Sequence, residues 1–563
     1  LVSLHSNAFD APSVSNDLDR IRPFMETWCI GCHEGRRSKA DLDLVVMLDR
    51  IDAGELPASI DRIIDRLNER DMPPPEEPGA PEEESGLDYA ASVALGAAKR
   101  REREAALGAS DMEVTFLGTA SCVPSITRGV SCVSLKFEGS TWLFDAGEGS
   151  QIQVQKSHVV HPGKVEAIFV THLHGDHSFG LPGLLCLIGQ NRVKGDAPVE
   201  VFGPQGLRLY LRASLKLTHA RVAAPYVVHE LVGVPLLAPP GFRPPPPPFK
   251  QSETQLERNF LADPDKNFGE QRGGRDIRPD ADGAWTLAPR GELAVRAAPM
   301  RHTVPCVGYV AVEPDKAGTL DVAKVEPILA RNAEALKQAG VKEPKRIFRL
   351  LKDMARDQTF TFPDGTALKR SECVGEDKPG RVVVVCGDTA DASALLPLLP
   401  PRGADVVVHE ATNARLEPWD ADKTDAEVAE ATAAHGHSTP TMAARFAKLA
   451  AAQCLALTHF SPRYRGDNAL SSISTMDKIE ASARQGFDED VIAAWDLLTL
   501  PVNAKTVEEA ARREGDAERL AVADAVRKER AKATAAKSKV PVRKPRAPPA
   551  AKAPPARRTA TAR

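Results

Sequence analysis

Short, continuously apolar segments recur along the chain between about residues 112 and 500, and polar or turn-forming residues separate them. Four of these segments are rich in β-branched or other apolar residues: 165–170, 381–386, 404–409 and 454–459. Continuously apolar strands are typical of sheets that are buried on both faces. Each of the four ends at, or is soon followed by, an acidic residue or a histidine. The pattern therefore predicts a layered α/β fold with its chemistry at the ends of strands.

A helical pattern follows the GHST sequence at 436–439. Ser438 and Thr439 are suitable N-caps, and Pro440 is suited to the first turn of a helix. Apolar residues then recur at helical spacing, at 442, 446 and 449. We therefore expect strands and helices to alternate in this part of the chain.

The pattern changes at both ends of the chain and once in the middle. Five segments are predicted: a small N-terminal module (1–88), a linker helix (89–111), the main domain (112–505), a helical extension (506–530) and a disordered basic tail (531–563). Within the main domain, 237–290 contains consecutive prolines and then a Gly/Asp-rich stretch. Consecutive prolines favour polyproline II and exclude helices and strand ladders, so this segment is predicted to be a loop insertion.

Composition indicates a folded protein, because hydrophobic residues make up 42% and charged residues 27% of the chain. The longest apolar runs, such as 382–386, are far shorter than the roughly 20 residues of a membrane-spanning helix. No membrane span is therefore expected. The nine cysteines are odd in number and mostly dispersed, which indicates reduced thiols.

The net charge of −4 hides a strong asymmetry. Residues 1–88 carry 20 acidic and 9 basic side chains, whereas 530–563 carry 11 basic and no acidic ones. A basic tail can hold RNA through its charge, but it can equally serve only to solubilise or target the chain.

The strongest chemical signal is the sequence THLHGDHSFGLPGLL at 171–185, which follows a predicted buried strand. Four potential ligands lie within six residues: His172, His174, Asp176 and His177. Extended backbone places the first two on one side, and Gly175 permits the bend that turns the other two toward a neighbouring point. Imidazole and carboxylate together suit Zn(II), although manganese or iron would accept similar ligands. A histidine-rich surface turn is the alternative, but clustered ionisable groups at the end of a core strand favour a site.

HLHGDH is the HxHxDH signature of the metallo-β-lactamase superfamily, and the surrounding sequence resembles ribonuclease Z, the tRNA 3′-processing endonuclease. Residues 113–151 are similar to the opening of that family, including a PSxxR element with Pro124, Ser125 and Arg128. Further segments follow in the family's order: GPQG (203–206), GDT (387–389), HEAT (409–412), GHST (436–439) and THFSPRY (458–464). The resemblance covers about 112–465 and implies a four-layer αββα sandwich.

The resemblance also implies a ligand set for two Zn(II) ions. One ion would be held by His172, His174 and His302, the other by Asp176, His177 and His459, with Asp388 bridging both. From the sequence alone, His302 could equally be a core or surface histidine, and Asp388 could be a capping aspartate at a strand-to-helix turn.

In the chemistry that the resemblance implies, water activated by the two metals attacks a phosphodiester, which leaves a tRNA 3′-hydroxyl and a trailer with a 5′-phosphate. Asp176 would accept the proton of that water, and His437 would orient or protonate the leaving 3′-oxygen. His409 and Glu410 would position these groups. Ser125 and Arg128 would contact the substrate.

The arm that grips the tRNA elbow in this family would fall within 313–375. Basic residues concentrate there, among them Lys342, Lys345, Arg346 and Arg349, and such residues bind phosphates with counterion release. A solvated helix face is the alternative. Because the arm and the metal set occur once, the chain resembles the short, homodimeric form, in which one subunit's arm holds precursor tRNA for the partner's site. An intracellular compartment that contains tRNA is expected.

The N-terminal module carries a different motif. CIGCH at 29–33 is the c-type haem attachment pattern, in which Cys29 and Cys32 would bond the haem and His33 would ligate its iron. Met72 is a candidate second axial ligand. The surrounding residues resemble a planctomycete-type cytochrome c domain, so one covalently bound haem c is a possible cofactor. Haem attachment outside the cytosol would conflict with action on precursor tRNA, and a fortuitous motif or haem-free remnant is the alternative.

Two other functions remain open from the sequence. The main domain could be another metallo-β-lactamase-fold hydrolase, such as an arylsulfatase or a cyclic-nucleotide phosphodiesterase, although the PSxxR element and the arm argue against it. The N-terminal module could instead make the chain an electron carrier.

Overall fold

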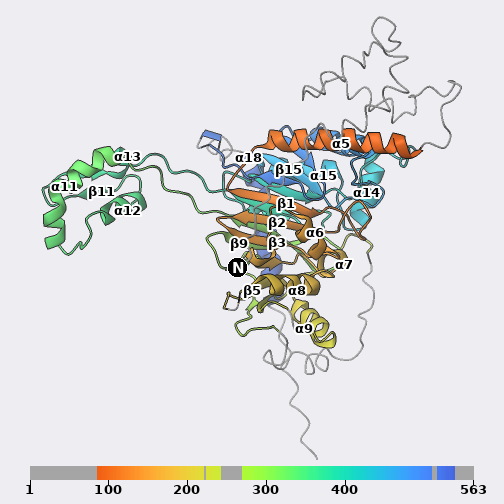
Figure 1. Ribbon diagram of the computed structural model, residues 1–563, viewed down its shortest axis with the longest axis horizontal. Coiled ribbons are helices and arrows are strands. Elements are labelled where there is room, and N and C mark those ends of the chain that lie inside the picture. The colour runs from red at the N-terminus through yellow and green to blue at the C-terminus, as the bar shows by residue number, and fades with distance from the viewer. Residues whose placement is uncertain are drawn as a thin grey trace, which may run out of the picture.

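The chain folds around two β-sheets that pack face to face, with helices on both outer faces (Figure 1). The computed structural model describes residues 85–193, 195–220, 223–242, 269–506, 508–509 and 517–538. The predicted haem ligands Cys29, Cys32, His33 and Met72 lie outside the described residues.

The first sheet has eight strands in the order β17-β1-β2-β3-β4-β5-β6-β7. Their bounds are β17 Thr499–Pro501, β1 Met112–Gly118, β2 Cys132–Phe137, β3 Ser140–Phe144, β4 Val165–Phe169, β5 Val199–Pro204, β6 Tyr226–Leu231 and β7 Asp276–Ile277. The pairs from β3 to β7 are parallel, and those from β17 to β3 are antiparallel.

The second sheet has seven strands in the order β16-β15-β14-β13-β10-β9-β8. Their bounds are β16 Asp490–Ala493, β15 Cys454–Thr458, β14 Val406–Glu410, β13 Val382–Val385, β10 Cys306–Val312, β9 Ala294–Met300 and β8 Trp285–Leu287. The four segments predicted as buried strands form β4, β13, β14 and β15.

Alternation along the strands builds the layers. In β4, Phe169 faces the second sheet, whereas Ile168 faces the helices. Phe169 stacks on Phe202 with ring centroids 5.1 Å apart and lies edge-on to Tyr309 of the second sheet at 5.5 Å. Aromatic contacts of this kind join the two sheets along the central layer.

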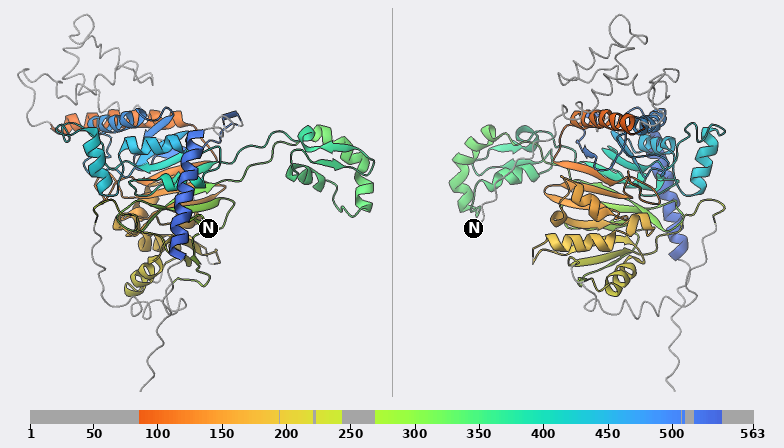
Figure 2. Two further views of the ribbon diagram at one scale, coloured as in Figure 1. Left: turned by 180° about the vertical axis from the view of Figure 1, so that it is seen from behind. Right: turned by 45° about the vertical axis from the view of Figure 1, so that its right-hand side comes forward.

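The outer faces are covered by helices. On the first sheet lie α6 Ser150–Lys156, η3 Pro162–Lys164, α7 Gly175–Ser178, α8 Leu181–Asn191 and α9 Leu207–Leu217. On the second sheet's side lie α5 Ser85–Leu107, η5 Ser393–Leu398, α14 Asp425–Ala434, α15 Pro440–Leu449, α16 Leu470–Arg484 and α18 Ala517–Ser538. The predicted four-layer αββα sandwich is thus confirmed (Figure 2). Among the residues that the structure describes, no helix has the length and apolar character of a membrane span.

An arm projects away from the sandwich between β10 and β13 (Figures 1 and 2). It contains α11 Val322–Gln338, α12 Arg346–Asp353, β11 Thr359–Thr361, β12 Ala367–Lys369 and α13 Arg370–Cys373. Two chain segments connect it to the body, and they pair through mutual backbone hydrogen bonds between Lys316 and Lys378. At the base, Arg381 forms two 2.7 Å ion-pair contacts with Glu313, and both side chains are buried.

The structure corrects three sequence-based expectations. The segment predicted as a loop insertion, 237–290, contains the strands β7 and β8. In β8 the side chains of Trp285 and Leu287 point to the same face and are buried between the two sheets. The tail predicted to be disordered from 531 is helical to Ser538, because its alanine-rich start favours α18. At α15, Ser438 and Thr439 make no side-chain cap, since Ser438 Oγ instead donates to the carbonyl of Thr389 at 2.6 Å.

The arm has its own hydrophobic core, which includes Leu351 of α12. We expect Leu351→Ala to destabilise the arm by about 2–5 kcal/mol, because it leaves a cavity in this small core. Hydrogen exchange of the arm amides should accelerate while that of β4 stays unchanged. Leu350→Ala is the matched control, since Leu350 is 44% exposed. Equal effects of the two substitutions, or faster exchange in β4, would contradict an independent arm core.

Candidate metal centre and active site

The site lies where several strands of both sheets end. β4 runs into the loop that carries His172 and His174, and α7 then carries Asp176 and His177. From the second sheet, Asp388 follows β13. Gly387 adopts φ 64°, and a Cβ there would lie 2.9 Å from Thr171 Cβ. A glycine is therefore required for β13 to bring Asp388 this close to the histidine loop.

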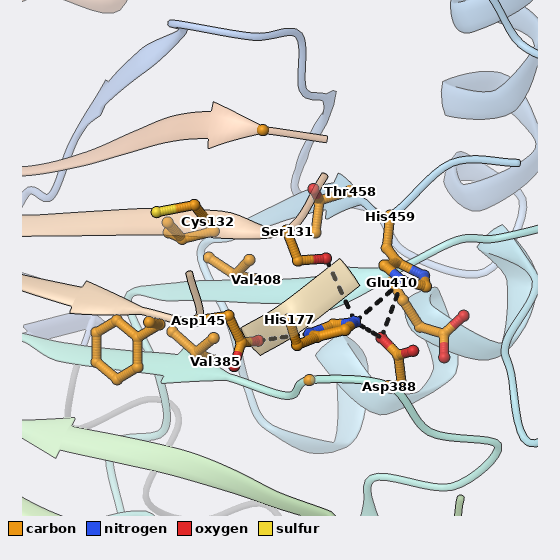
Figure 3. A pocket seen from close by; sticks show the side chains of 14 residues that line it. Ser131, Cys132, Asp145, His177, Val385, Asp388, Val408, Glu410, Thr458 and His459 are labelled. Atoms are coloured by element: carbon orange, nitrogen blue, oxygen red, sulfur yellow. Dashed lines mark hydrogen bonds and ion pairs between the residues drawn. The ribbon is translucent and has the colours of Figure 1, made fainter. Parts of the chain in front are cut away.

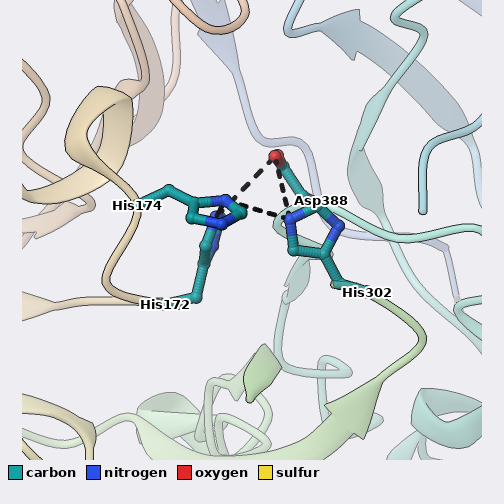
Figure 4. Close-up of side chains that lie close together, drawn as sticks. All are labelled: His172, His174, His302 and Asp388. Atoms are coloured by element: carbon teal, nitrogen blue, oxygen red, sulfur yellow. Dashed lines mark hydrogen bonds and ion pairs between the residues drawn. The ribbon is translucent and has the colours of Figure 1, made fainter. Parts of the chain in front are cut away.

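A first group joins three histidines and one aspartate: His172, His174, His302 and Asp388 (Figure 4). His172 Nε2 and His302 Nε2 lie 3.0 and 3.2 Å from His174 Nδ1. Asp388 Oδ2 lies 3.8 Å from Nε2 of both His172 and His302. The three rings thus direct nitrogen atoms toward one point beside the carboxylate.

A second group lies on the other side of the same aspartate: Asp176, His177, Asp388 and His459. Figure 3 shows three of them, His177, Asp388 and His459. Asp388 Oδ1 lies 3.3 Å from His177 Nε2 and 3.2 Å from His459 Nε2. Asp176 Oδ2 lies 3.4 Å from His459 Nε2. Each oxygen of Asp388 therefore faces a different group.

The residues in both groups fit a pair of zinc ions. Two nitrogens that each lie about 2.0–2.1 Å from a tetrahedral zinc are roughly 3.3 Å apart, close to the 3.0–3.3 Å between neighbouring imidazole nitrogens here. Asp388 Oδ1 is buried without a hydrogen-bond partner in the described residues. A buried carboxylate oxygen of this kind is costly unless a cation compensates it. Geometry and chemistry thus agree with a metal centre.

Burial adjusts the protonation of two of these histidines. It lowers the pKa of His172 well below the ordinary value, and it lowers the pKa of His302 to about 4. Both imidazoles are therefore neutral at neutral pH, which is the form that binds metals.

Residues behind the two groups hold the rings in place. His177 Nδ1 donates to Asp145 Oδ2 at 2.7 Å, and His302 Nδ1 donates to the carbonyl of Gly436 at 2.8 Å. His459 Nδ1 donates to Thr412 Oγ1 at 3.0 Å. Such contacts orient a ligating imidazole and fix its tautomer. No role was expected for Asp145. Its position nevertheless carries the same sequence signal as that of Asp388, namely an acidic residue that directly follows or soon follows an apolar strand.

Glu410 organises the rim of the site. Its carboxylate accepts hydrogen bonds from His437 Nδ1 at 3.1 Å, from the backbone N–H of Thr389 at 2.7 Å and from the backbone N–H of Ser438 at 3.0 Å. Burial opposes a charge on His437, but Glu410 and Asp388 outweigh it and raise the pKa of His437 to about 9. His437 therefore carries a proton at neutral pH.

The predicted role of His409 is not supported by its position. As the neighbour of Glu410 on β14 it points to the opposite face of the sheet, where its ring packs 5.7 Å from Phe446 of α15. Its Nδ1 donates to the carbonyl of Glu410 at 2.8 Å. The alternation of side chains along a strand means that only one of two adjacent residues can face the site.

The PSxxR element also differs from expectation. Arg128, predicted to contact substrate, is only 2% exposed and donates to the carbonyl of Tyr464 at 3.0 Å and to Thr119 Oγ1 at 2.7 Å. It therefore fixes the 121–128 loop from beneath instead of contacting substrate. Ser125 is at the surface, where its Oγ accepts from the backbone N–H of Arg128 at 3.0 Å.

The predicted basic residues of the arm are exposed: Lys342, Lys345, Arg346 and Arg349. The side chain of Arg349 is 90% exposed and lies 3.4 Å from Asp353, a contact that solvent weakens. Both views show the arm far from α7, so it does not reach the metal groups of its own chain (Figures 1 and 2).

A cleft of about 430 Å³ opens over the two groups. It is lined by His174, Asp176, Asp388, His437 and His459, together with residues 121–124 and Phe179. The candidate ligands and the raised-pKa histidine thus share one solvent-accessible space.

Known proteins are similar in sequence to this chain over about 70% of its length. The metallo-beta-lactamase superfamily model matches residues 126–262. Zinc phosphodiesterase ELAC protein 1 of Mus musculus is 36% identical over 401 residues, which are 70% of this chain and 99% of that protein. Ribonuclease Z of Synechococcus sp. (strain WH7803) is 33% identical over 397 residues, 70% of this chain and 98% of that protein. The crystal structure of human tRNase Z, short form (ELAC1), is 29% identical, with a TM-score of 0.41, and the match covers 70% of this chain and all of that one.

Two of these relatives are more than 30% identical and are matched over almost their whole length. The described residues of this chain also form the two sheets and the two ligand groups reported above. The chain therefore belongs to the ribonuclease Z family of the metallo-β-lactamase superfamily.

Proposed function

We propose that the chain is a zinc-dependent endoribonuclease that removes the 3′ trailer from precursor tRNA. The observation that carries the proposal is the pair of ligand groups that share Asp388 at the floor of one cleft, in a chain of the ribonuclease Z family. A two-metal site of this kind is suited to hydrolyse phosphodiesters, and RNA provides such bonds.

In this proposal His172, His174 and His302 would hold one zinc ion, Asp176, His177 and His459 would hold the other, and Asp388 would be shared between the two groups. When bound, the two ions lower the pKa of a water molecule and stabilise the charge that develops on the phosphate. Asp176 lies at the rim of this arrangement. Burial opposes a charge on Asp176, but the neighbouring His459 and His177 outweigh it and hold the pKa of the Asp176 carboxyl below its ordinary value. The carboxylate is therefore anionic and can accept a proton from the attacking water.

His437 supplies the complementary proton. It lines the cleft beside Asp388 and His459, and Glu410 keeps it charged. A protonated imidazole there can donate to the 3′-oxygen that leaves, which is otherwise a poor leaving group. Glu410 is a positioning residue, because it acts through His437 and does not line the 430 Å³ cleft.

The arm supplies substrate selection in this proposal. Shape and phosphate contacts must distinguish tRNA from other RNA, and exposed basic residues on a projecting arm are suited to both. Because the arm points away from its own cleft, we infer a homodimer in which each arm holds precursor tRNA for the partner's site. An arylsulfatase or a cyclic-nucleotide phosphodiesterase would have no use for such an arm. We place the enzyme in a compartment that contains tRNA.

The direct test uses the full chain and a 3′-extended precursor tRNA. The wild type is expected to release a trailer with a 5′-phosphate, and Asp176→Ala should lower the rate at least about 100-fold, because it removes a ligand and proton acceptor. Gel analysis of the end-labelled RNA measures both. Asp196→Ala, at an exposed loop residue, is the control. A wild-type chain that leaves the precursor intact would refute the proposal.

The charge on Glu410 determines the pH range in which His437 is protonated. Glu410→Gln removes the negative charge that raises the pKa of His437, so this pKa should fall. His437 then loses its proton at a lower pH than in the wild type. The alkaline limb of the kcat/KM profile for precursor tRNA should therefore move toward neutrality. An alkaline limb at the wild-type position would exclude His437 as the donor.

The hydrogen bond between His177 and Asp145 should contribute to zinc affinity. Asp145→Asn replaces the oxygen that accepts from His177 Nδ1 by an amide, which should weaken zinc affinity about 10- to 100-fold. Competition with a chelator, followed by elemental analysis, measures the affinity without any substrate. Asp357→Asn, at an exposed arm residue, should bind zinc as the wild type does. Unchanged affinity in Asp145→Asn would show that this contact does not support the metal centre.

A further inference from the structure

A large aromatic side chain lies exposed at the edge of the catalytic cleft. Phe179 directly follows α7, lines the cleft with Asp176 and His174, and is 65% exposed. Most large apolar side chains of this body are buried, so an exposed ring beside the ligand groups needs an explanation. None of the roles assigned above uses it.

The ring is held in place by its own backbone turn. The N–H of Phe179 donates to the carbonyl of Gly175 at 2.8 Å. A Cβ placed on Gly175 would lie 2.2 Å from Phe179 Cε2 and 2.6 Å from its Cζ. One part of the ring therefore lies directly against Gly175, and a side chain at position 175 would displace the ring from this position. The remainder of the ring is presented to solvent.

Gly175, which contacts the ring, is part of the 172–177 segment that carries four of the candidate metal ligands. Gly175 lies between the candidate ligands His174 and Asp176 in the sequence. A phosphodiester that reaches the metal centre must therefore bring its neighbouring nucleotides close to Phe179. Val123 and Pro124 line the same cleft, and Val123 is 52% exposed, so the apolar surface is broader than the ring alone.

We propose that Phe179 is a stacking platform for the base of a nucleotide next to the scissile phosphate. The inference rests on the proposed function and adds a residue that positions the single-stranded end of the RNA. Aromatic rings bind unpaired bases by stacking, with little dependence on base identity because every base has a π-face. The platform thus aligns the bond to be cut while it tolerates different trailers.

The test compares three substitutions at Phe179 in the full chain with precursor tRNA. Phe179→Ala should lower kcat/KM roughly 10-fold or more, as the loss of one stacked base does. Phe179→Leu, which remains apolar but cannot stack, should lose most of the activity, whereas Phe179→Trp should retain it. Ile152→Ala on α6 is the matched control, because Ile152 is 53% exposed and does not line the cleft. Zinc content and mass from light scattering should be unchanged in all variants.

Abasic substrates identify the stacked nucleotide. Two precursors are prepared that lack the base on the 5′ side or on the 3′ side of the scissile phosphate. If Phe179 stacks on one of these bases, the effect of Phe179→Ala disappears on one of the two substrates. An effect that persists on both, a fully active Phe179→Leu, or a variant that loses its dimer would overturn the inference. A wild type that cleaves no precursor would overturn the proposed function with it, so the two failures are distinguishable.

Discussion

A buried carboxylate whose two oxygens face two different groups of histidines is the constraint on which the site depends. Asp388 is 2% exposed, and its Oδ2 and Oδ1 face different groups of histidines. An uncompensated carboxylate at this depth would be strongly destabilising. The surrounding chain is arranged to make the double contact possible: Gly387 lets the strand approach Thr171, and His459 adopts φ 58°, an uncommon conformation for a residue with a side chain. Such backbone strain is typical of functional sites.

The sandwich explains how residues so distant in sequence meet. Both sheets contain parallel strand pairs, the segments after β4, β9, β13 and β15 supply the two ligand groups, and Glu410 is the last residue of β14. The aromatic layer around Phe169 and Tyr309 holds the two sheets in register behind the site. Hydrogen bonds that the rings donate to Asp145, Thr412 and the Gly436 carbonyl then fix their orientation. The chemistry is therefore carried by loops, and its precision comes from the core.

Much of this arrangement could be predicted from the sequence, because apolar strands that end in histidines or acids leave a local signal. A layered α/β fold and the proximity of the 172–177 loop residues follow from that signal, whereas the four-layer αββα sandwich was implied by the resemblance to ribonuclease Z. The sequence could not predict which way a side chain points or how deeply it is buried. Arg128 matches a motif but is buried under its loop, and His409 is next to Glu410 but faces away. Asp145 was missed although it directly follows an apolar strand, and Phe179 was missed because no sequence pattern marks it. What the two side chains contact, His177 and Gly175, is visible only in the structure.

The attachment of the arm has a consequence for the evolution of the enzyme. The arm leaves after Val312 and returns before Val382, and these two residues are paired neighbours in adjacent antiparallel strands. Topologically the whole arm is the connection of one β-hairpin. Its length and composition can therefore diverge without shifting the register of β10 or β13, and so without moving Asp388. Adaptation to new RNA shapes is in this way uncoupled from preservation of the reaction centre.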